Sequence, residues 1–320
     1  MHILIIHDRL SKFASKDELD TRLQAQQVAA AITSLGHHVS QTVFSLDLPF
    51  MRTRIAKLNP DHVFNLVETL EGSKLLHVAP ALFETMGLPF SGGGSQGMMM
   101  TSDKPLAKRL MRLAGIPTPA WVGSDTTGDM TDFLETPLIV KPVTEEASVG
   151  INDDSVRVFH TVEELRDAMQ GAKGRPLFIE RYIEGREFNI SVMPFDGVPT
   201  VLPIAEMLFL DYPAGKPTIA GYEAKWEEHS FAYTHTQRSF SFMPQDGPLL
   251  ERLHELSLRC WHLFGARGYA RVDFRVDAAG EPYVLEVNLN PCVAQDSGFT
   301  AAAMQQGLSY VQMIERILKG

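Results

Sequence analysis

Cysteine is scarce in this sequence: only Cys260 and Cys292 occur among its 320 residues, and they lie far apart. Two isolated cysteines provide neither a disulfide framework nor the paired thiolates of a zinc cluster. A chain of this kind suits a reducing compartment, so we expect a cytoplasmic protein.

Long apolar runs and an excess of positive charge are also lacking. The N-terminal run ILII is interrupted by His7-Asp8-Arg9, too early for a signal peptide, and no later run is long enough to cross a bilayer. Lys and Arg number 29 against 39 Asp and Glu, which gives a formal charge of −10. We therefore expect no nucleic-acid partner and no membrane association, although a few local cations would suffice for a nucleotide.

What is present describes a large globular protein. A hydrophobic content of 44% over 320 residues is enough for a large core and predicts two or three domains. The strand-like run MHILII, a helix-like segment over 17–35 and a second strand over 62–67 predict an α/β unit at the N-terminus. Further predicted elements are helices over 75–86, 101–114, 162–169, 249–264 and 300–318, and strands over 137–141, 177–180 and 188–193.

Two details of this pattern are specific enough to be checked. The helix over 101–114 places Leu106, Leu110 and Leu113 on one apolar stripe. Residues 206–240 lose all periodicity and are interrupted by Pro and Gly, which in a compact enzyme is typical of a functional lid.

The stretch SGGGSQG, residues 91–97, contains a literal G-x-G-x-x-G. A dinucleotide site also requires an acid about 20 residues further on, to bind a ribose hydroxyl. After Asp103 no carboxylate occurs until Asp125, so the glycines alone do not indicate a nicotinamide cofactor.

A charged hairpin near the C-terminus is the most informative segment. In YARVDFRVD the period of two places Arg271, Asp273 and Arg275 on one face, and the returning strand YVLEVNLN adds Glu286 and Asn288. A turn at 278–280 brings Asp273 close to Glu286, with an uncertainty of one residue in register. Facing carboxylates with an amide oxygen suit Mg²⁺, whereas the alternative is an ordinary solvated strand face.

Two other segments carry residues suited to a nucleotide. Lys141 ends a strand and precedes TEEASVG, whose small residues allow backbone N–H groups to approach phosphates. The segment FIERYIEGREFNISV then places Glu180 and Glu187 on either side of a turn at Gly185, where carboxylates can accept hydrogen bonds from adenine and ribose. Each feature has an ordinary surface interpretation, but their order along the chain describes a triphosphate, a nucleoside and a metal.

Together these segments resemble the ATP-grasp superfamily and, within it, the D-alanine–D-alanine ligase family. The resemblance extends from Asp61 to the C-terminus and rests on MGLPFSGGG, SDKPLAKRLMRLAGIPTP, IVKPVTEEASVG, IERYIEGREFNISV, YEAKW, ARVDF and LEVNLNP. It implies an α/β (α+β) protein of three α/β domains, with ATP between the central and C-terminal domains. We expect an N-terminal substrate-binding domain over 1–100, a central domain over 101–186, and a C-terminal domain with the lid and metal site over 187–320.

The resemblance also implies roles for single residues. ATP phosphates are expected at Lys104, Lys141 and the loop of Glu145, Ser148 and Gly150, adenine at Glu180 and the hinge through Ile183, and ribose at Glu187. Mg²⁺ (or Mn²⁺) is expected at Asp273, Glu286 and Asn288, with Arg271, Lys225 and Ser148 as catalytic residues. Amino-acid substrates are expected at Ser297, Trp226 and either Asp17 or Glu18. The implied reaction joins a small-molecule carboxylate to an amine through an acyl phosphate, and the implied assembly is a homodimer.

The departures from the family fall on the amino-acid side. The serine of the phosphate loop is replaced by Ala147, although Ser148 follows, the tyrosine after the lid lysine by Trp226, and a glycine after Pro291 by Cys292. Two N-terminal loops are replaced by HDRLSKFASKDELD and VETLEGSK. Three interpretations remain: a ligase with altered amino-acid specificity, D-alanine–D-alanine ligase itself, and an ATP-binding regulatory protein without turnover.

Overall fold

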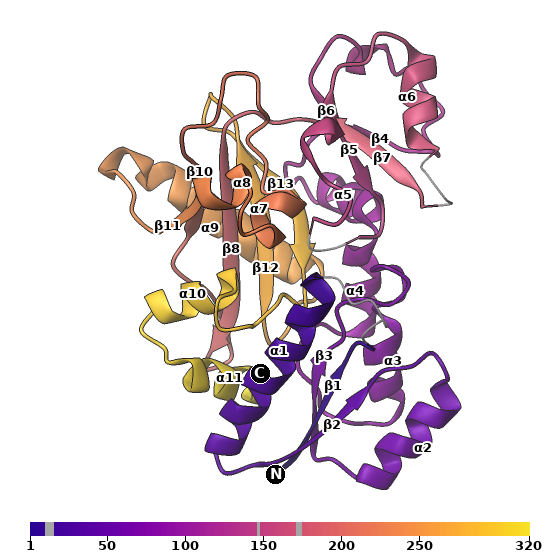
Figure 1. Cartoon of the computed structure of the whole chain (residues 1–320), viewed down its shortest axis with the longest axis vertical. Coiled ribbons are helices and arrows are strands. Elements are labelled where there is room, and N and C mark those ends of the chain that lie inside the picture. The colour runs from indigo at the N-terminus through magenta and orange to yellow at the C-terminus, as the bar shows by residue number, and fades with distance from the viewer. Residues whose placement is uncertain (10–15, 146–147, 171–174) are drawn as a thin grey trace.

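The computed structural model describes residues 1–9, 16–145, 148–170 and 175–320, arranged around three β-sheets (Figure 1). The N-terminal sheet lies at one end, the four-stranded sheet at the other, and the largest sheet alongside both. This α/β architecture agrees with the expected fold class.

The N-terminal sheet is parallel, with strand order β2-β1-β3. Its strands are β1 (His2–His7), β2 (His38–Val43) and β3 (His62–Leu66), and its helices are α1 (Lys16–Ser34), α2 (Leu48–Leu58) and α3 (Val78–Thr85). Because parallel strands end at the same edge of a sheet, the residues after β1 and β3, including Asp8 and Glu68, lie close together: Asp8 Oδ2 accepts a hydrogen bond from the Glu68 amide at 2.9 Å.

The four-stranded sheet comes from the middle of the sequence, and we call it the central sheet. It is antiparallel, in the order β4-β7-β5-β6. Its elements are α4 (Ser95–Ser102), α5 (Lys104–Leu113), β4 (Trp121–Val122), η1 (Thr131–Phe133), β5 (Leu138–Pro142), η2 (Asp153–Ser155), β6 (Val156–Arg157), α6 (Val162–Met169) and β7 (Leu177–Arg181). The strands predicted around Lys141 and Glu180 are therefore β5 and β7, which are direct neighbours.

The C-terminal sheet runs β11-β10-β8-β12-β13, with β9 paired to β8. Its elements are β8 (Arg186–Phe195), β9 (Val198–Val201), β10 (Ala205–Phe209), α7 (Tyr222–Trp226), α8 (Phe231–His235), β11 (Thr236–Ser239), η3 (Pro244–Asp246), α9 (Gly247–Leu263), β12 (Ala270–Val276), β13 (Pro282–Asn288), α10 (Gly298–Gln305) and α11 (Tyr310–Lys319). The hairpin of β12 and β13 confirms the predicted register, since Asp273 pairs with Glu286.

Three sequence predictions were wrong in detail. The helix over 300–318 is two helices, because Gly307 adopts a left-handed φ of 92° and Ser309 caps α11. The helix over 101–114 is also two, because Asp103 has an extended backbone and its side chain accepts a hydrogen bond from the Leu106 amide, which starts α5. The interval 206–240, predicted to be irregular, contains β10, α7, α8 and β11.

The predicted apolar stripe of α5 was wrong as well. Leu113 is 85% exposed, whereas the buried face carries Lys104, Lys108 and Met111. The apolar period failed to predict the buried face of this helix because that face holds two lysines, Lys104 and Lys108.

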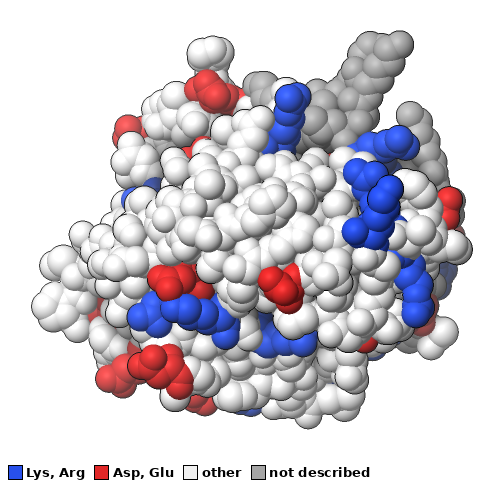
Figure 2. Space-filling view, turned by 90° about the horizontal axis from the view of Figure 1, so that it is seen from below, with Lys and Arg blue, Asp and Glu red and all other residues white. Residues whose placement is uncertain are grey.

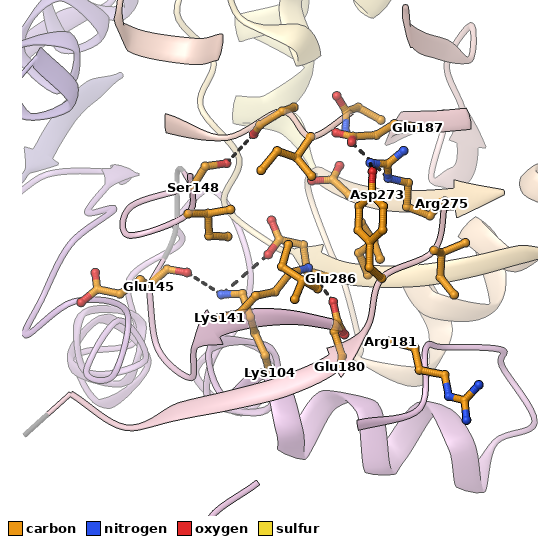
Figure 3. A pocket seen from close by; sticks show the side chains of 18 of the residues that line it. Lys104, Lys141, Glu145, Ser148, Glu180, Arg181, Glu187, Asp273, Arg275 and Glu286 are labelled. Atoms are coloured by element: carbon orange, nitrogen blue, oxygen red, sulfur yellow. Dashed lines mark hydrogen bonds and ion pairs between the residues drawn. The ribbon is translucent and has the colours of Figure 1, made fainter. Parts of the chain in front are cut away.

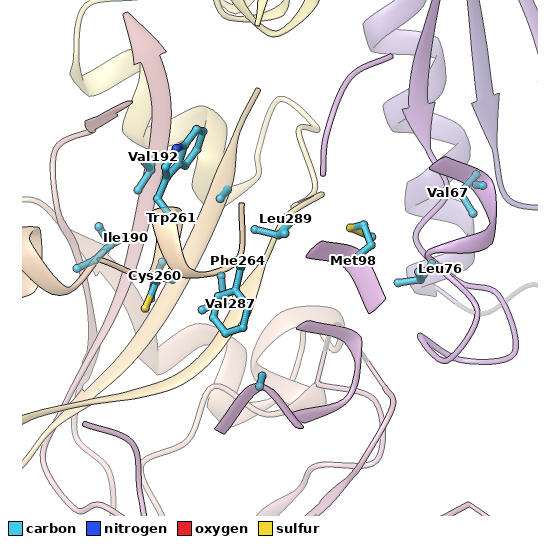
Figure 4. Close-up of a cluster of buried hydrophobic side chains, with 14 of the residues drawn as sticks. Val67, Leu76, Met98, Ile190, Val192, Cys260, Trp261, Phe264, Val287 and Leu289 are labelled. Atoms are coloured by element: carbon cyan, nitrogen blue, oxygen red, sulfur yellow. The ribbon is translucent and has the colours of Figure 1, made fainter. Parts of the chain in front are cut away.

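The glycine stretch before α4 serves packing between layers. A Cβ on Gly97 would stand 2.6 Å from the carbonyl oxygen of Phe264, so only glycine permits α4 to approach α9 this closely. Met98 of α4 belongs to the same buried cluster as Leu76 of the N-terminal layer and Leu289 of the C-terminal layer (Figure 4). The glycines thus fix how the N-terminal layer meets the largest sheet.

On the face shown in Figure 2, Lys and Arg gather along the right side, acidic and basic side chains adjoin at the lower left, and most of the surface between them is uncharged. Within the described ranges, we find no helix that is both long enough and apolar enough to span a membrane.

Candidate active site

The first of two adjoining pockets lies between the central and C-terminal sheets, and we call it the intersheet pocket (Figure 3). Its charged walls come from strands whose registers the sequence fixes. Predicted site residues that line it are Lys104, Lys141, Glu145, Ser148, Glu180, Ile183, Glu187, Lys225, Asp273 and Glu286.

A buried row of charges forms the floor of the intersheet pocket. The Glu180 carboxylate lies 2.6 Å from Lys108 Nζ on one side and 2.6 Å from Lys141 Nζ on the other. Burial alone would raise the pKa of Glu180, but the two lysines outweigh it and hold the pKa below its usual value. Lys108 also donates to Thr118 Oγ1 at 2.7 Å. Glu180 is thus ionised and fixes the position of Lys141.

The facing carboxylates of β12 and β13 form a second charged group. Arg271 donates to both oxygens of Asp273 at 2.8 Å, and Lys104 Nζ lies 3.6 Å from Glu286. Burial opposes ionisation of Glu286, yet Lys104 and Arg271 bring its pKa down to about 2. Because the face is a pocket wall with matched charges, the solvated-face interpretation was wrong. These ionised oxygens suit Mg²⁺.

Asn288 occupies a different place from the two carboxylates. It pairs with Arg271 and lines the neighbouring pocket, and its Oδ1 accepts a hydrogen bond from the Asn290 amide at 2.8 Å. Across the residues that the structure describes, no group of three or more His, Cys, Asp or Glu side chains is suited to hold a metal. A metal ion here would therefore rely on Asp273 and Glu286, with other oxygens completing its coordination.

Hydrogen bonds connect the predicted phosphate loop to residues 206–240, the segment predicted to be a lid, which we call the lid. Ser148 Oγ donates to the carbonyl oxygen of Ala220 at 2.8 Å, and the Tyr222 amide donates to the carbonyl of Ile151 at 3.0 Å. Lys104 Nζ donates to the carbonyl oxygen of Glu145. Gly150, with a φ of 81°, packs against Pro142 and is outside the described lining of the intersheet pocket.

The hinge between the two sheets is fixed by Arg275. Its guanidinium donates to the Gly185 carbonyl at 2.8 Å and lies 3.4 Å from Glu187. Gly185 has a φ of 145°, and a Cβ there would overlap the Val276 carbonyl, so this position requires glycine. The main chain from Glu180 to Glu187 is thereby held along the pocket edge.

The second pocket, which we call the lid-side pocket, has a volume of about 520 Å³ and lies between the N-terminal layer, the lid and the C-terminal sheet. Its lid and C-terminal walls include Lys225, Trp226, Arg238, Arg271, Asn288, Cys292 and Ser297, and its N-terminal wall includes Asp8, Asp20 and Glu68.

The substrate residues predicted from the sequence fall partly in this lid-side pocket. Trp226 and Ser297 line it, and Ser297 caps α10 by accepting a hydrogen bond from the Thr300 amide at 3.2 Å. The side chains of Asp17 and Glu18, like Ala147, lie outside the described residues.

Sequence reasoning missed several charged residues that line the two pockets: Arg181, Asp8, Asp20, Glu68, Arg238 and Asp296. It also missed Lys108, which is buried against Glu180. One signal was available, because Lys104 and Lys108 are four residues apart and share a helix face. Asp8 directly follows a buried strand, a place where site residues gather in parallel sheets.

Comparison with known proteins agrees with this geometry. Residues 110–319 match the family model for the D-ala D-ala ligase C-terminus. The chain is 30% identical over 92% of its length to a D-alanine–D-alanine ligase of Gloeobacter violaceus, covering 92% of that protein, and 27% identical over 91% to that of Aquifex aeolicus, also covering 92%. An uncharacterized Sinorhizobium fredii protein, y4sG, is 30% identical over 92% of this chain and 86% of its own.

Solved structures show the same fold. The D-alanine–D-alanine ligase of Bacillus anthracis in complex with ATP superposes with a TM-score of 0.75 at 23% identity, covering 100% of this chain and 96% of that one. The D-Ala:D-Ser ligase VanG of Enterococcus faecalis gives 0.71 at 20% identity, covering 99% and 98%.

The two sheets and the charged pocket between them define an ATP-grasp enzyme, an ATP-dependent ligase that forms carbon–nitrogen bonds. Since the family model covers about two thirds of the chain, this protein belongs to the D-alanine–D-alanine ligase family, of which it is a divergent member.

Proposed function

We propose that this protein joins the carboxylate of one amino-acid-like substrate to the amine of another, with a specificity different from that for two D-alanines. One observation carries the proposal. The intersheet pocket holds the family's charged residues, whereas the lid-side pocket is lined by Trp226, Cys292 and an acidic N-terminal wall. Polar groups of D-alanine left unpaired in such a site would cost about 1 to 3 kcal/mol each.

For the nucleotide, we propose that Lys104 and Lys141 contact phosphates, that the backbone of the hinge through Ile183 binds adenine, and that Glu187 binds ribose. Glu180 departs from the expected adenine contact, because both its oxygens lie 2.6 Å from lysines. Its proposed role is to orient Lys141. Gly150 and Glu145 shape the phosphate loop, and Ser148 holds that loop against the lid.

For the metal, Asp273 and Glu286 are the proposed ligands of Mg²⁺ or Mn²⁺, with Asn288 as a further oxygen donor at the edge of the lid-side pocket. The metal would supply positive charge that offsets the triphosphate. Arg271 and Lys104 lie beside these carboxylates, so two cationic side chains adjoin the proposed position of the metal and the triphosphate.

The proposed chemistry begins with a carboxylate, which is a poor electrophile. Transfer of the γ-phosphoryl group to its oxygen gives an acyl phosphate and ADP, and attack by the amine then forms the amide and releases phosphate and a proton. Arg271 and Lys225 are proposed to lower the repulsion between the carboxylate and the triphosphate. The closed lid keeps water from hydrolysing the intermediate.

The amino group of the donor needs a carboxylate near the N-terminal layer. Asp17 or Glu18 remains a candidate for that role, and the described wall adds Asp8, Asp20 and Glu68. Ser297, at the start of α10, is proposed to receive the carboxylate of the acceptor, as a helix start favours an anion. Dimer formation is a separate proposal, to be checked by light scattering.

Product analysis tests the proposed function. Purified protein is incubated with ATP and Mg²⁺ on D-alanine alone and then on D- and L-amino acids and hydroxy acids, while phosphate release and product mass are followed together. A new amide with another pair supports the proposal. Efficient formation of D-alanyl-D-alanine would instead show that the family's parental reaction persists, and ATP binding without phosphate release on any pair would favour the regulatory interpretation.

A second test addresses the nucleotide site alone. Lys141→Ala is expected to abolish ATP binding in calorimetry, because the phosphate charge loses its buried partner. Undiminished affinity would remove Lys141 from the site.

A further inference from the structure

One arginine of the lid-side pocket has no role in the reaction proposed above. Arg238 lies on β11, where it pairs with Met207 of β10. Thr236 is two residues away on the same strand and so lies on the same face. All three residues line the lid-side pocket, which shows that the strand register turns Arg238 toward it.

Arg238 differs from Arg271 and Arg275 in that, among the described residues, no acidic side chain is paired with it. Arg271 is matched by both oxygens of Asp273, and Arg275 lies 3.4 Å from Glu187. Within the described part of the chain, the side chain of Arg238 makes neither a hydrogen bond nor an ion pair, although the charge of Asp296 acts on it, and it remains accessible to solvent. A planar guanidinium of this kind suits bidentate recognition of a carboxylate.

The surroundings of Arg238 specify where its ligand would lie. Its Nη2 is 3.5 Å from the point where a Cβ of Gly298 would stand, so the guanidinium occupies the space beside the residue that follows Ser297. Ser297 is the proposed receptor of the acceptor's carboxylate. The proposed carboxylate position at Ser297 and the guanidinium of Arg238 therefore lie side by side.

We propose that the acceptor carries two carboxylates, one at Ser297 and a second on Arg238, and is therefore an amino acid of the aspartate or glutamate type. The inference rests on the proposed ligase function, since it names the substrate class of that same site. An acceptor with one carboxylate would occupy only one of the two positions. Asp8, Asp20 and Glu68 line the pocket on its N-terminal side, and Asp296 lines it beside Ser297. The charge of Asp296 acts on Arg238, but among the described residues the two side chains form no ion pair, so the guanidinium keeps its donors for a ligand.

Calorimetry with matched ligands tests the inference separately from turnover. The protein is loaded with Mg²⁺ and a non-hydrolysable ATP analogue, and D- and L-aspartate and glutamate are compared with asparagine and glutamine of the same hand. Each pair has almost the same shape and differs in one charge. We expect at least one diacid to bind about tenfold or more tightly than its amide, the effect of a charged hydrogen bond.

Variants then assign that difference to Arg238. Arg238→Met is expected to remove the preference for the diacid, and Arg238→Lys to keep part of it, because the charge stays while the planar fork is lost. Arg52→Met, on the exposed side of α2, makes the same change of charge outside both pockets and is expected to leave the preference intact.

The other outcomes would contradict either the role of Arg238 or the ligase reaction. Equal binding of diacid and amide, no binding of any diacid, or a preference that survives Arg238→Met refutes the assignment of Arg238. Ligation of alanine-type acceptors alone also refutes it while leaving the proposed ligase function in place. Diacid binding that depends on Arg238 without phosphate release on any donor counts against ligation and leaves the binding site standing.

Discussion

The two pockets of this protein are built in different ways. The intersheet pocket takes most of its charged residues from β5, β7, β8, β12 and β13, strands paired in fixed registers. Most of its charges are matched at 2.6 to 3.6 Å. The lid-side pocket shares a wall of the C-terminal sheet, and its other walls are strand ends of the N-terminal sheet, the lid and the start of α10.

This difference teaches how a ligase can change substrates without losing ATP. A strand that carries a phosphate-binding residue also carries buried core residues on its other face, so its register is fixed by packing. Loops and helix starts tolerate replacement. The amino-acid side can therefore diverge while the nucleotide side is retained.

The largest expected effect is a loss of turnover caused by a substitution in the intersheet pocket. Glu286→Gln removes one of the two facing ionised carboxylates, and we expect Mg²⁺-dependent turnover to fall on the order of 10²- to 10³-fold. Glu281→Gln, at the exposed turn of the same hairpin, is the matched control. An unchanged rate in phosphate-release assays would exclude Glu286 from the metal site.

A second prediction concerns the buried charge row below that pocket. Lys108→Met leaves Glu180 with one partner only, and we expect the free energy of unfolding to fall by about 3 kcal/mol. Chemical denaturation measures it. Arg109→Met removes an exposed ion pair on the same helix and is expected to cost less than about 1 kcal/mol. Equal effects of the two changes would contradict a stabilising role for the row.

The N-terminal layer, which walls only the lid-side pocket, is expected to be sensitive to acid. Burial lowers the pKa of His62 to about 4, so the unfolded chain binds a proton more readily than the folded chain. The stability contribution is complete above about pH 6.5 and is lost as the pH falls toward 4, by up to roughly 3 kcal/mol. Denaturation series across this range should show less pH dependence in His62→Leu, but not in His160→Gln, whose ring is exposed.

The smallest expected effect is a change in one KM value that distinguishes the lid-side pocket from the intersheet pocket. Trp226→Phe removes an indole N–H from the lid-side pocket, and we expect the KM for the amino-acid substrate to rise about tenfold while the KM for ATP stays unchanged. Trp121→Phe in β4, away from the lid, serves as control. A parallel rise in both KM values would show that the pockets are coupled through the lid.

Sequence patterns predicted the intersheet pocket well because its residues follow local rules. The alternation in β12 and β13 placed Asp273 opposite Glu286, and the structure confirms that pairing. The same rules failed where tertiary contacts compete with periodicity. In α5 the apolar Leu113 is exposed and Lys108 is buried, because Glu180 on another element supplies the charge that makes a buried lysine tolerable.

By itself, then, the sequence determined the family, the strands of the intersheet pocket and the pairing of its carboxylates, since hydrophobic period and turn position fix register locally. Only the tertiary structure decided which groups wall the lid-side pocket. Asp8, the lid residues Trp226 and Arg238, and Ser297 come from three segments that are distant in the sequence. These side chains lie close together only because the three sheets pack as they do, and the contact of Gly97 with Phe264 is part of that packing. Local sequence patterns do not predict contacts between such distant segments.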